Sequence, residues 1–401
     1  MSALAKSRVP LALAAVLVTA LVLAACGSSS STGSGSASSS ASSSGSSGSG
    51  SSGSGASSSS ASALVSEPPE SPLTSDPITQ SLKARPASDK TLVWLACSLP
   101  SCQGDLSLGY KQAAQALGWK FIQINYSETS PGPAVQQALN DNPSYIAITG
   151  TPPVSFAAED AEALKRHIPI VSCFDTTAPD PAKNDIYMQC LNSKGYGDEA
   201  NQLTAWITDK SGGKANVVIV NVPDYPILNA ETQAVQAGYK QDCPKCTVSV
   251  LNLSLADVSS GQAAPKILAY VQSHPSVNYI QATFADPADG LPELLKAAGL
   301  SSRVQIVGVE ADPPSLKGIE DGTIAAFTNQ PMVFLGWENV DALARLSEGM
   351  PLAPYETTGD DPTWVVDSGD EAKSLLAEPS QQWAGPAGFQ SEFKKLWHLS
   401  N

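Results

Sequence analysis

The sequence predicts an α/β protein with two doubly wound lobes that enclose a cleft. Three observations predict this class. Short β-branched runs alternate with amphipathic, helix-like runs from residue 91 onward, which is the pattern of a parallel sheet covered on both faces. The alternation occurs as two successive series. The segment that carries it is about 310 residues long, which is too long for one ordinary core and suits two lobes.

The first 25 residues are typical of a signal peptide. Lys6 and Arg8 precede an apolar stretch at residues 11–23, which is short for a membrane span and is followed at once by polar residues. The stretch ends Leu-Ala-Ala-Cys-Gly, with the cysteine at position 26. This ending resembles the bacterial lipobox, which implies that Cys26 receives diacylglycerol and becomes the mature N-terminus. An uncleaved anchor or an ordinary secretory signal is the alternative.

A low-complexity segment follows the cysteine. Residues 27–63 are Ser, Gly and Ala with a single Thr, so no side chain there buries enough apolar area to offset the entropy of ordering. We expect residues 26–63 to form a lipidated, disordered tether, with an end-to-end distance of about 35 Å for a Gly/Ser coil. The Pro-containing residues 64–90 show neither helical nor strand periodicity and are predicted to extend this linker.

Both series of the folded part have short strands separated by helices. The first predicts strands at 91–96, 120–125, 145–149 and 169–173, with helix-like stretches at 106–117, 134–140 and 156–167. The second predicts strands at 216–221, 247–252, 279–283, 304–309 and 324–328, with helix-like runs such as 230–239 and 265–273. Ligands of open α/β sheets bind beyond the carboxyl ends of the strands, so two such lobes facing each other form a binding cleft.

Charge and composition exclude several classes of partner. The formal net charge is −15, aromatic residues make up 6% of the chain, and no basic cluster occurs. These features argue against nucleic acid and against an anionic membrane surface as partners.

Six cysteines remain when Cys26 is set aside, which is an even number for an exported protein. Short separations favour pairing neighbours in the sequence, although fifteen pairings are possible: Cys97 with Cys102, Cys173 with Cys190, and Cys243 with Cys246. The last pair, in a CxxC arrangement, could instead be a redox or zinc pair. No second CxxC and no nearby histidine supplies further ligands, so we expect a disulfide and no metal.

Motifs for catalysis are missing from the folded region. It contains no GxSxG, HExxH or GxGxxG pattern and no paired CxxC sites, so nucleophilic, metal and dinucleotide chemistry lack their usual residues. The run Ser-Gly-Gly-Lys at 211–214 precedes a predicted strand, whereas a phosphate-binding loop follows one, and it is predicted to be a turn that ends a helix. We predict no catalytic residue and no cofactor.

From residue 91 to the C-terminus, the chain resembles the type I periplasmic solute-binding family, and the ribose-binding group in particular. The matching blocks are GYKQAA at 109–114, HIPIV at 167–171, VGVE at 307–310, and LKGIEDGTIAA at 316–326 followed by Asn329 and Gln330. The last block is the most distinctive. The resemblance implies the periplasmic binding protein-like I fold, with Rossmann-like lobes joined by a hinge.

This resemblance also implies that the chain crosses between the lobes three times, near residues 191–193, 330–332 and 359–362. We therefore expect lobe 1 to contain residues 91–191 and 331–360. Lobe 2 should contain residues 192–330 and 361–401. Hinge closure around a ligand would follow.

Several ligand-binding candidates are carried over from the family by position. Gln330 matches a ligand-contacting glutamine, although it could also be an amide that stabilises the hinge. Glu310 stands where the family usually has an aspartate, with a solvated loop acid as the alternative. Asp175 stands where sugar binders often show an Asp-Arg pair, but the arginine is missing.

Other positions depart from the sugar-binding pattern. Gln233 stands in place of an arginine, and Phe284 replaces an asparagine. Phe174, Tyr225 and Phe284 could supply apolar faces to the ligand. Trp337 could too, but its position on a helix face favours core packing. We therefore predict a pocket that is more aromatic and less ionic than a ribose site, so the ligand is a sugar or a less polar solute.

The predicted function is capture of a small solute outside the cytoplasmic membrane and delivery to an ABC importer's permease subunits. The alternative is a ligand-sensing lipoprotein that reports to a membrane receptor or sensor kinase, and a third possibility is a tethered cell-wall enzyme. We expect a monomer attached to the cell membrane through lipid.

Overall fold

The computed structural model describes residues 80–399, except residues 181, 183–185 and 360. The predicted signal peptide, the lipidation of Cys26 and the tether lie outside the described residues, as does most of the linker. Within the part that is described, no helix is both long and apolar enough to cross a membrane.

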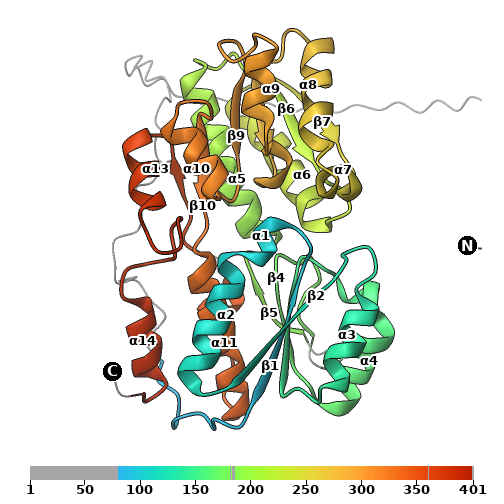
Figure 1. Ribbon diagram of the computed structural model, residues 1–401, viewed down its shortest axis with the longest axis vertical. Coiled ribbons are helices and arrows are strands. Elements are labelled where there is room, and N and C mark those ends of the chain that lie inside the picture. The colour runs from blue at the N-terminus through green and yellow to red at the C-terminus, as the bar shows by residue number, and fades with distance from the viewer. Residues whose placement is uncertain (1–79, 181, 183–185, 360, 400–401) are drawn as a thin grey trace, which may run out of the picture. The chain divides into compact units, whose positions relative to one another are not determined.

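Lobe 1 is built on a five-stranded parallel sheet of order β2-β1-β3-β4-β5 (Figure 1). Its strands are β1 Thr91–Ala96, β2 Lys120–Asn125, β3 Tyr145–Thr149, β4 Ile170–Cys173 and β5 Ile186–Cys190. On one side lie α2 Asp105–Leu117 and α11 Met332–Ser347, and on the other lie α3 Gly132–Asn140 and α4 Ala157–Arg166. The short elements are α1 Pro100–Gln103, η2 Pro153–Phe156 and α12 Tyr355–Thr358.

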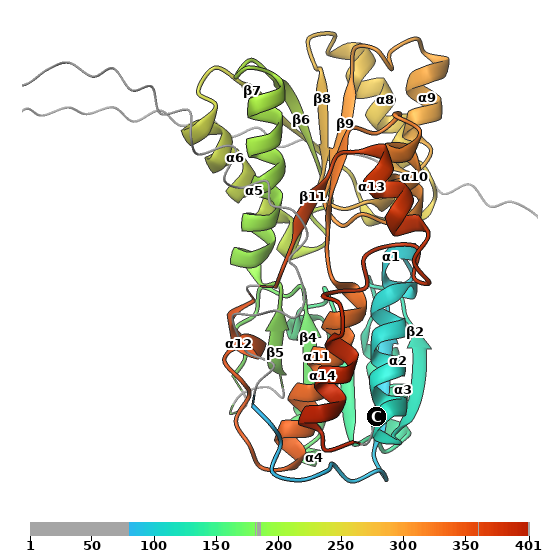
Figure 2. The ribbon, with the colours of Figure 1, turned by 90° about the vertical axis from the view of Figure 1, so that its left-hand side faces the viewer.

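Lobe 2 is built on a six-stranded sheet of order β11-β10-β9-β8-β6-β7, in which only the β10–β11 pair is antiparallel. Its strands are β6 Asn216–Asn221, β7 Thr247–Asn252, β8 Tyr279–Ala282, β9 Gln305–Gly308, β10 Ala326–Asn329 and β11 Trp364–Val366. Figure 2 shows α5 Ser193–Lys210 and α6 Pro226–Asp242 on one side of this sheet, with α8 Ala263–Ser273 and α9 Leu291–Ala297 on the other. The remaining elements are α7 Leu255–Ser259, η3 Asp286–Ala288, α10 Pro313–Glu320 and α13 Gly369–Leu376.

The predicted fold class is confirmed, and so are the nine predicted strands to within two residues at each end. The sequence analysis missed β5 and β11. Parallel register places the carboxyl ends of each sheet's parallel strands at one edge, as in the pairs Thr149↔Cys173 and Asn221↔Asn252. These edges are where a doubly wound lobe binds its ligand.

Lobe 1 has a close contact between α2 and α11. A Cβ atom added to Gly109 would lie 2.3 Å from the backbone oxygen of Val333, and one added to Gly336 would lie 2.5 Å from the backbone nitrogen of Tyr110. Only glycine fits at these two positions. The core beneath is aromatic, with the rings of Trp94 and Tyr110 stacked at 4.5 Å.

The chain passes between the two sheets after β5, after β10 and after α12, and it returns to lobe 1 after α13 (Figure 2). The returning helix, α14 Phe389–Leu396, packs on α11, where the rings of Trp337 and Trp397 stack at 5.3 Å. Our expectation that residues 361–401 lie entirely in lobe 2 was therefore wrong for the last part of this range. Trp337 is in this aromatic core, as its position on a helix predicted.

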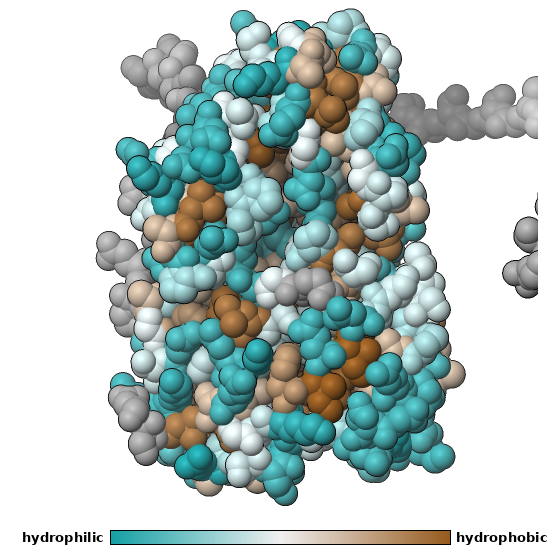
Figure 3. Space-filling model, viewed as in Figure 1, coloured by the Kyte–Doolittle hydropathy of each residue, from teal (hydrophilic) through white to brown (hydrophobic). Residues whose placement is uncertain are grey.

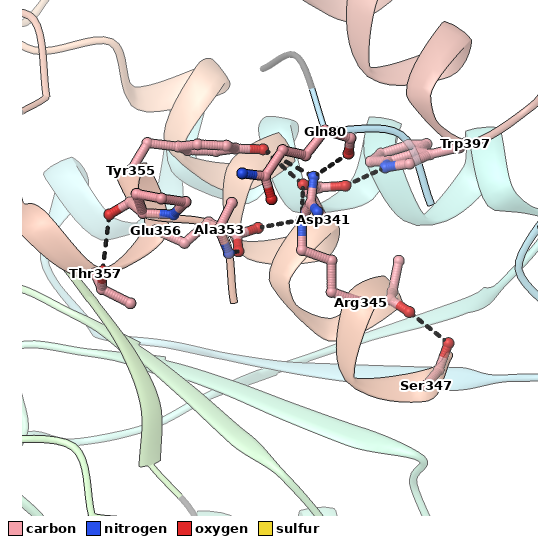
Figure 4. Close-up of polar contacts among 11 residues, drawn as sticks. Gln80, Asp341, Arg345, Ser347, Ala353, Tyr355, Glu356, Thr357 and Trp397 are labelled. Atoms are coloured by element: carbon pink, nitrogen blue, oxygen red, sulfur yellow. Dashed lines mark hydrogen bonds and ion pairs between the residues drawn. The ribbon is translucent and has the colours of Figure 1, made fainter. Parts of the chain in front are cut away.

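A buried polar cluster fastens the returning segment to α11 (Figure 4). The Asp341 carboxylate accepts hydrogen bonds from Arg345 Nε (2.8 Å), the Tyr355 hydroxyl (2.7 Å) and Trp397 Nε1 (2.6 Å). Arg345 also donates to the backbone oxygen of Gln80, 2.6 Å away. The side chains of Asp341 and Arg345 are fully buried. This cluster joins α11, α12, the segment after α14 and the start of the described chain.

Candidate functional site: a cavity between the lobes

A cavity lies between the two lobes at the carboxyl ends of their strands. The space within its walls is about 500 Å³, part of which opens to solvent. Residues from both lobes line it: Leu99, Ser101, Leu106, Thr149, Gly150 and Phe174 from lobe 1, Tyr196, Tyr225, Ile227, Leu228, Phe284 and Glu310 from lobe 2, and Met332 after the second crossing. Most of these side chains are apolar.

Four aromatic rings dominate the wall. Phe174 of lobe 1 meets Tyr196 of lobe 2 edge to face, with ring centroids 5.6 Å apart. Tyr225 and Phe284 form a second edge-to-face pair at 6.5 Å. The Tyr225 ring also packs on the backbone of Gly150, where an added Cβ would lie 3.5 Å from it. The lobes therefore contact each other across the cavity through aromatic side chains.

The chain topology explains why these rings meet. Phe174 directly follows β4, and Phe284 lies two residues after β8. Tyr225 caps the start of α6 after β6, while Tyr196 lies in the first turn of α5, just after the first crossing. Each of these positions is at the cleft edge of its lobe, where strand ends and helix starts converge.

Among the described residues that line this cavity, Glu310 is the one with an acidic side chain. It follows β9 in a left-handed backbone conformation (φ 66°), and its backbone nitrogen donates to Thr328 Oγ1 at 3.2 Å. The Tyr196 hydroxyl donates to its Oε2 at 3.5 Å. Burial raises the pKa of Glu310 well above its usual range, and the nearby carboxyls of Asp286, Glu199 and Asp312 raise the pKa further. Both effects favour the protonated, uncharged form of this carboxyl when no positive charge is near.

Two further glutamates are buried behind the cavity. Glu199 on α5 accepts a hydrogen bond from Gln330 Nε2 at 2.7 Å, and burial raises its pKa to about 8. Glu231 on α6 is 1% exposed, and neither of its carboxyl oxygens has a hydrogen-bond partner. Burial, then Glu199 and Glu310, raise the pKa of Glu231 well above its usual range. No lysine or arginine pairs with either glutamate among the ion pairs of the described residues.

The structure brings together four of the seven predicted ligand-binding residues: Phe174, Tyr225, Phe284 and Glu310. Gln330 is buried beside Glu199 and does not line the cavity, so its contact with a ligand stays a prediction. Asp175 is buried too, where it accepts hydrogen bonds from the Thr177 backbone (2.8 Å) and Ser172 (3.4 Å).

Gln233 was the poorest of the carried-over assignments. It is exposed on α6 and does not line the cavity. The neighbouring turn of α6 buries Glu231 instead, because residues two apart on a helix point in different directions.

Sequence reasoning missed the residues of the cavity wall that lie in the first turns of helices. Tyr196 follows the predicted crossing at residues 191–193, and Ile227 and Leu228 open the helix after Tyr225. Only their position, in the first turn of a helix that follows a strand-end loop, could have indicated a place in the wall. That position does not decide the matter, because an apolar residue there can face either the cleft or the core.

Disulfides support the strand ends of lobe 1. Cys173 pairs with Cys190 and Cys243 with Cys246, which confirms two of the predicted pairings. Cys97 is also disulfide-bonded, and the side chain of Cys102, its predicted partner, lies outside the described residues. The Cys173–Cys190 disulfide joins the end of β4 to the end of β5, next to Phe174. In the described part of the chain, no three His, Cys, Asp or Glu side chains are grouped so that they could hold a metal ion.

Comparisons with known proteins agree with this architecture. Residues 106–351 match the family model described as "Periplasmic binding protein domain". No curated protein matches the sequence. Among solved structures, the sugar-binding protein of a sugar ABC transporter from Bacillus halodurans has a TM-score of 0.60 at 18% identity, and the match covers 71% of this chain and 99% of that one.

Two other similar structures were solved with a ligand. A 5-methylthioribose transporter solute-binding protein from Thermotoga lettingae has a TM-score of 0.63 at 16% identity, covering 79% of this chain and 100% of that one. An ABC transporter solute-binding protein from Burkholderia graminis, in complex with D-arabinose, has a TM-score of 0.60 at 18% identity, covering 72% and 97%. At these identities the likeness shows a shared fold.

Proposed function

Because the chain belongs to the periplasmic binding protein domain family, we propose that it captures a small solute in the cavity between its lobes and delivers it to an ABC importer. The chain is a binding protein and not an enzyme, so the tethered cell-wall enzyme is set aside. One observation carries the proposal. Side chains from both lobes form a single aromatic-lined cavity at the carboxyl ends of the strands.

The mechanism follows from this shared wall. A solute that contacts Phe174 of lobe 1 and Tyr225 or Phe284 of lobe 2 stabilises the conformation in which both lobes touch it. A permease that docks on both lobes then distinguishes the liganded from the empty protein. The solute is a sugar or a related compound with an apolar part, since the wall offers ring faces more than polar clamps.

The proposal includes attachment to the membrane through Cys26. Lipid on this residue and a Ser/Gly tether would hold the binding lobes close to a membrane permease while leaving them free to reorient. The variant Cys26→Ala should appear in the soluble fraction of cells instead of the membrane fraction. Its mass should lack the acyl chains that the wild-type protein carries.

Ligand binding is the direct test of the proposed function. Purified protein without lipid should show an increase in Tm with one class of solute in a screen of sugars, polyols, nucleosides and aromatic amines, because a ligand that binds the folded state raises its stability. The variant Phe284→Ala should abolish the increase. If no small solute raises Tm or gives a heat of binding, the proposal fails.

Transport and sensing would use the same cavity and differ in the partner. Deletion of the chain should abolish uptake of the radiolabelled solute if it delivers to an importer. Normal uptake, combined with loss of a transcriptional response to the solute, would favour the sensor.

A further inference from the structure

Two further cavities adjoin the main one around α1. One shares Ser101, Glu310 and Met332 with it, and the other shares Leu99. The short helix α1 therefore lies at the meeting point of three hollows between the lobes. Figure 1 shows it at the junction of the two lobes. An entry beside α1 would take a solute past the walls of these hollows before it reached the rings.

Acidic residues line these hollows, and basic residues do not. The first neighbouring cavity is lined by Asp105, Asp289, Glu310 and Asp312, and the second by Asp286 and Asp289. None of the three cavities has a lysine, arginine or histidine among its described lining residues. This entry would repel an anionic solute, and the net charge of −15 adds to that effect.

These carboxyls hold their protons unusually well. Burial is the largest cause in each case, and it raises the pKa of Asp105 to about 6, that of Asp286 to about 6 and that of Asp289 to about 7. Asp312 already has a structural role, since its Oδ1 accepts the hydrogen bond of the Ser315 backbone at the start of α10. Asp105, Asp286 and Asp289 have no comparable role in capping a helix.

Asp286 is the most deeply buried carboxyl in the wall of the second neighbouring cavity. It is 6% exposed, it lines the second neighbouring cavity, and neither of its oxygens has a hydrogen bond of normal geometry. The nearby Ser101 lowers its pKa, but by less than burial raises it. A buried carboxylate with no partner costs free energy that a bound positive charge would remove.

Rings and carboxyls together define a ligand chemistry. An ammonium group is attracted to the faces of Tyr and Phe within about 6 Å of the ring centroid, and more strongly where water is excluded. The cavity lined by Phe174, Tyr196, Tyr225 and Phe284 offers four such rings, with Glu310 in the same wall. The other polar groups in this wall are the hydroxyls of Ser101, Thr149, Tyr196 and Tyr225, and none of them carries a positive charge that would repel a cation.

We propose that the solute is an organic cation, with an ammonium group held among the rings of Phe174, Tyr196, Tyr225 and Phe284 and neutralised by Glu310, with Asp286 at the adjoining entry. This inference rests on the proposed function, because it names the class of solute that the cavity captures. It departs from the sugars that the similar structures contain.

Proton release should accompany binding. The groups that face Glu310 from the surrounding elements are Tyr196 and Glu199 on α5, Glu231 on α6, Asp286 on η3 and Asp312 before α10. All of the carboxyls in this set have a raised pKa in the empty protein, so a bound cation displaces protons from them. The affinity for a cation should therefore rise with pH between about 6 and about 8, the pKa values of Asp286 and Glu199.

Pairs of charged and uncharged isosteres test the proposal by titration calorimetry. The probes are choline with 3,3-dimethylbutan-1-ol, and tyramine with 4-ethylphenol, together with D-arabinose, D-galactose and adenosine. At least one cation should bind at least about tenfold more tightly than its neutral isostere. If a neutral sugar or nucleoside binds and no cation does, the inference is wrong while solute capture stands. If none of the probes binds, the proposed function itself is contradicted.

Variants locate the charge effect. Glu310→Gln should weaken binding of the cation about tenfold and flatten its pH dependence while leaving the neutral isostere unaffected. Phe284→Leu, which keeps apolar volume but removes a ring, should also weaken the cation selectively. The matched controls are Glu392→Gln on α14 and Tyr270→Leu on α8, both outside the cavities, and neither should change binding. Unchanged affinity and pH dependence in Glu310→Gln would overturn the assignment of this residue, and the pH profile of the wild-type protein tests the proposal without any variant.

Discussion

Replacing Asp341 by asparagine should destabilise the protein strongly, although the two side chains have nearly the same shape. Both carboxylate oxygens accept hydrogen bonds: Oδ2 from Arg345 and Tyr355, and Oδ1 from Trp397. An asparagine can offer only one oxygen, so its amide group must face a donor on one side. The guanidinium of Arg345 also loses its closest charge partner in a site where both side chains are fully buried.

The expected loss is about 3–5 kcal/mol in the free energy of unfolding, which is typical of removing one partner from a buried ion pair. Glu356 Oε1, 3.4 Å from Arg345 Nε, compensates part of the charge and keeps the loss near the lower end of this range. Urea denaturation followed by tryptophan fluorescence measures it. The control is Asp370→Asn at the start of α13, which should change stability by less than about 0.5 kcal/mol.

A double-mutant cycle tests the geometry behind this estimate. Trp397→Phe removes the donor to Oδ1 and so gives the asparagine amide a place to point. Asp341→Asn should therefore cost less in the Trp397→Phe background than in the wild-type protein. A loss below about 1 kcal/mol for Asp341→Asn alone, or strict additivity in the cycle, would refute this reasoning.

Three other predictions follow from the packing and the buried charges. Stability of the ligand-free protein should fall as pH rises from about 4.5 to about 8. Burial raises the folded-state pKa of Glu199, Glu231 and Glu310, so the folded state binds more protons than the unfolded state in this range. The fall in the free energy of unfolding is up to about 1.4 kcal/mol per pH unit for each carboxyl. Thermal melts should show it, with a smaller fall in Glu231→Gln, and a flat profile would contradict the burial of these groups. Gly336→Ala should cost about 2–3 kcal/mol in urea denaturation through its clash with the α2 backbone, and a loss below about 1 kcal/mol would contradict this close packing of α11 on α2. Removing the Cys173–Cys190 disulfide by alanine substitution should cost about 3 kcal/mol, and removing Cys243–Cys246 about 2, because the first closes a longer loop; equal losses would contradict this ranking.

The parallel core of both lobes was predictable because buried strands in such sheets are continuous apolar runs. Residues 216–221, with four apolar side chains between two asparagines, are an example, and the strand there has the predicted bounds. This signal is weaker in the two missed strands, because a glutamine interrupts the apolar run of β5 Ile186–Cys190 and β11 is very short. β11 is three residues long and pairs antiparallel with β10, so its identity depends on a partner more than thirty residues away.

The position of α14 could not be predicted for a similar reason. Its apolar face would suit either lobe, and the choice is made by Trp397, which stacks on Trp337 and donates to Asp341. Both partners are about sixty residues earlier in the chain. Three of the four rings in the site were predictable, since Phe174, Tyr225 and Phe284 all follow strands. Glu231 was not, because an acid on a helix is usually solvated and only the packing of α5 on α6 buries it.

The side chains around the cavity connect the charge of the proposed solute with the conformation in which both lobes contact it. Figure 3 shows a face that is mainly hydrophilic, with hydrophobic residues only in separate patches. The four rings line the cavity between the lobes. Carboxyls without a basic partner among the described ion pairs are buried beside these rings, and burial raises the pKa of Glu310 and Glu231, which favours their uncharged forms. A cationic solute would remove the cost of ionising these carboxyls, and it would therefore stabilise the closed conformation more than an uncharged solute of the same shape. If the proposed delivery to a permease holds, selectivity for charge and the signal to that permease would come from the same residues, because neutralising Glu310 would favour the conformation in which both lobes contact the solute.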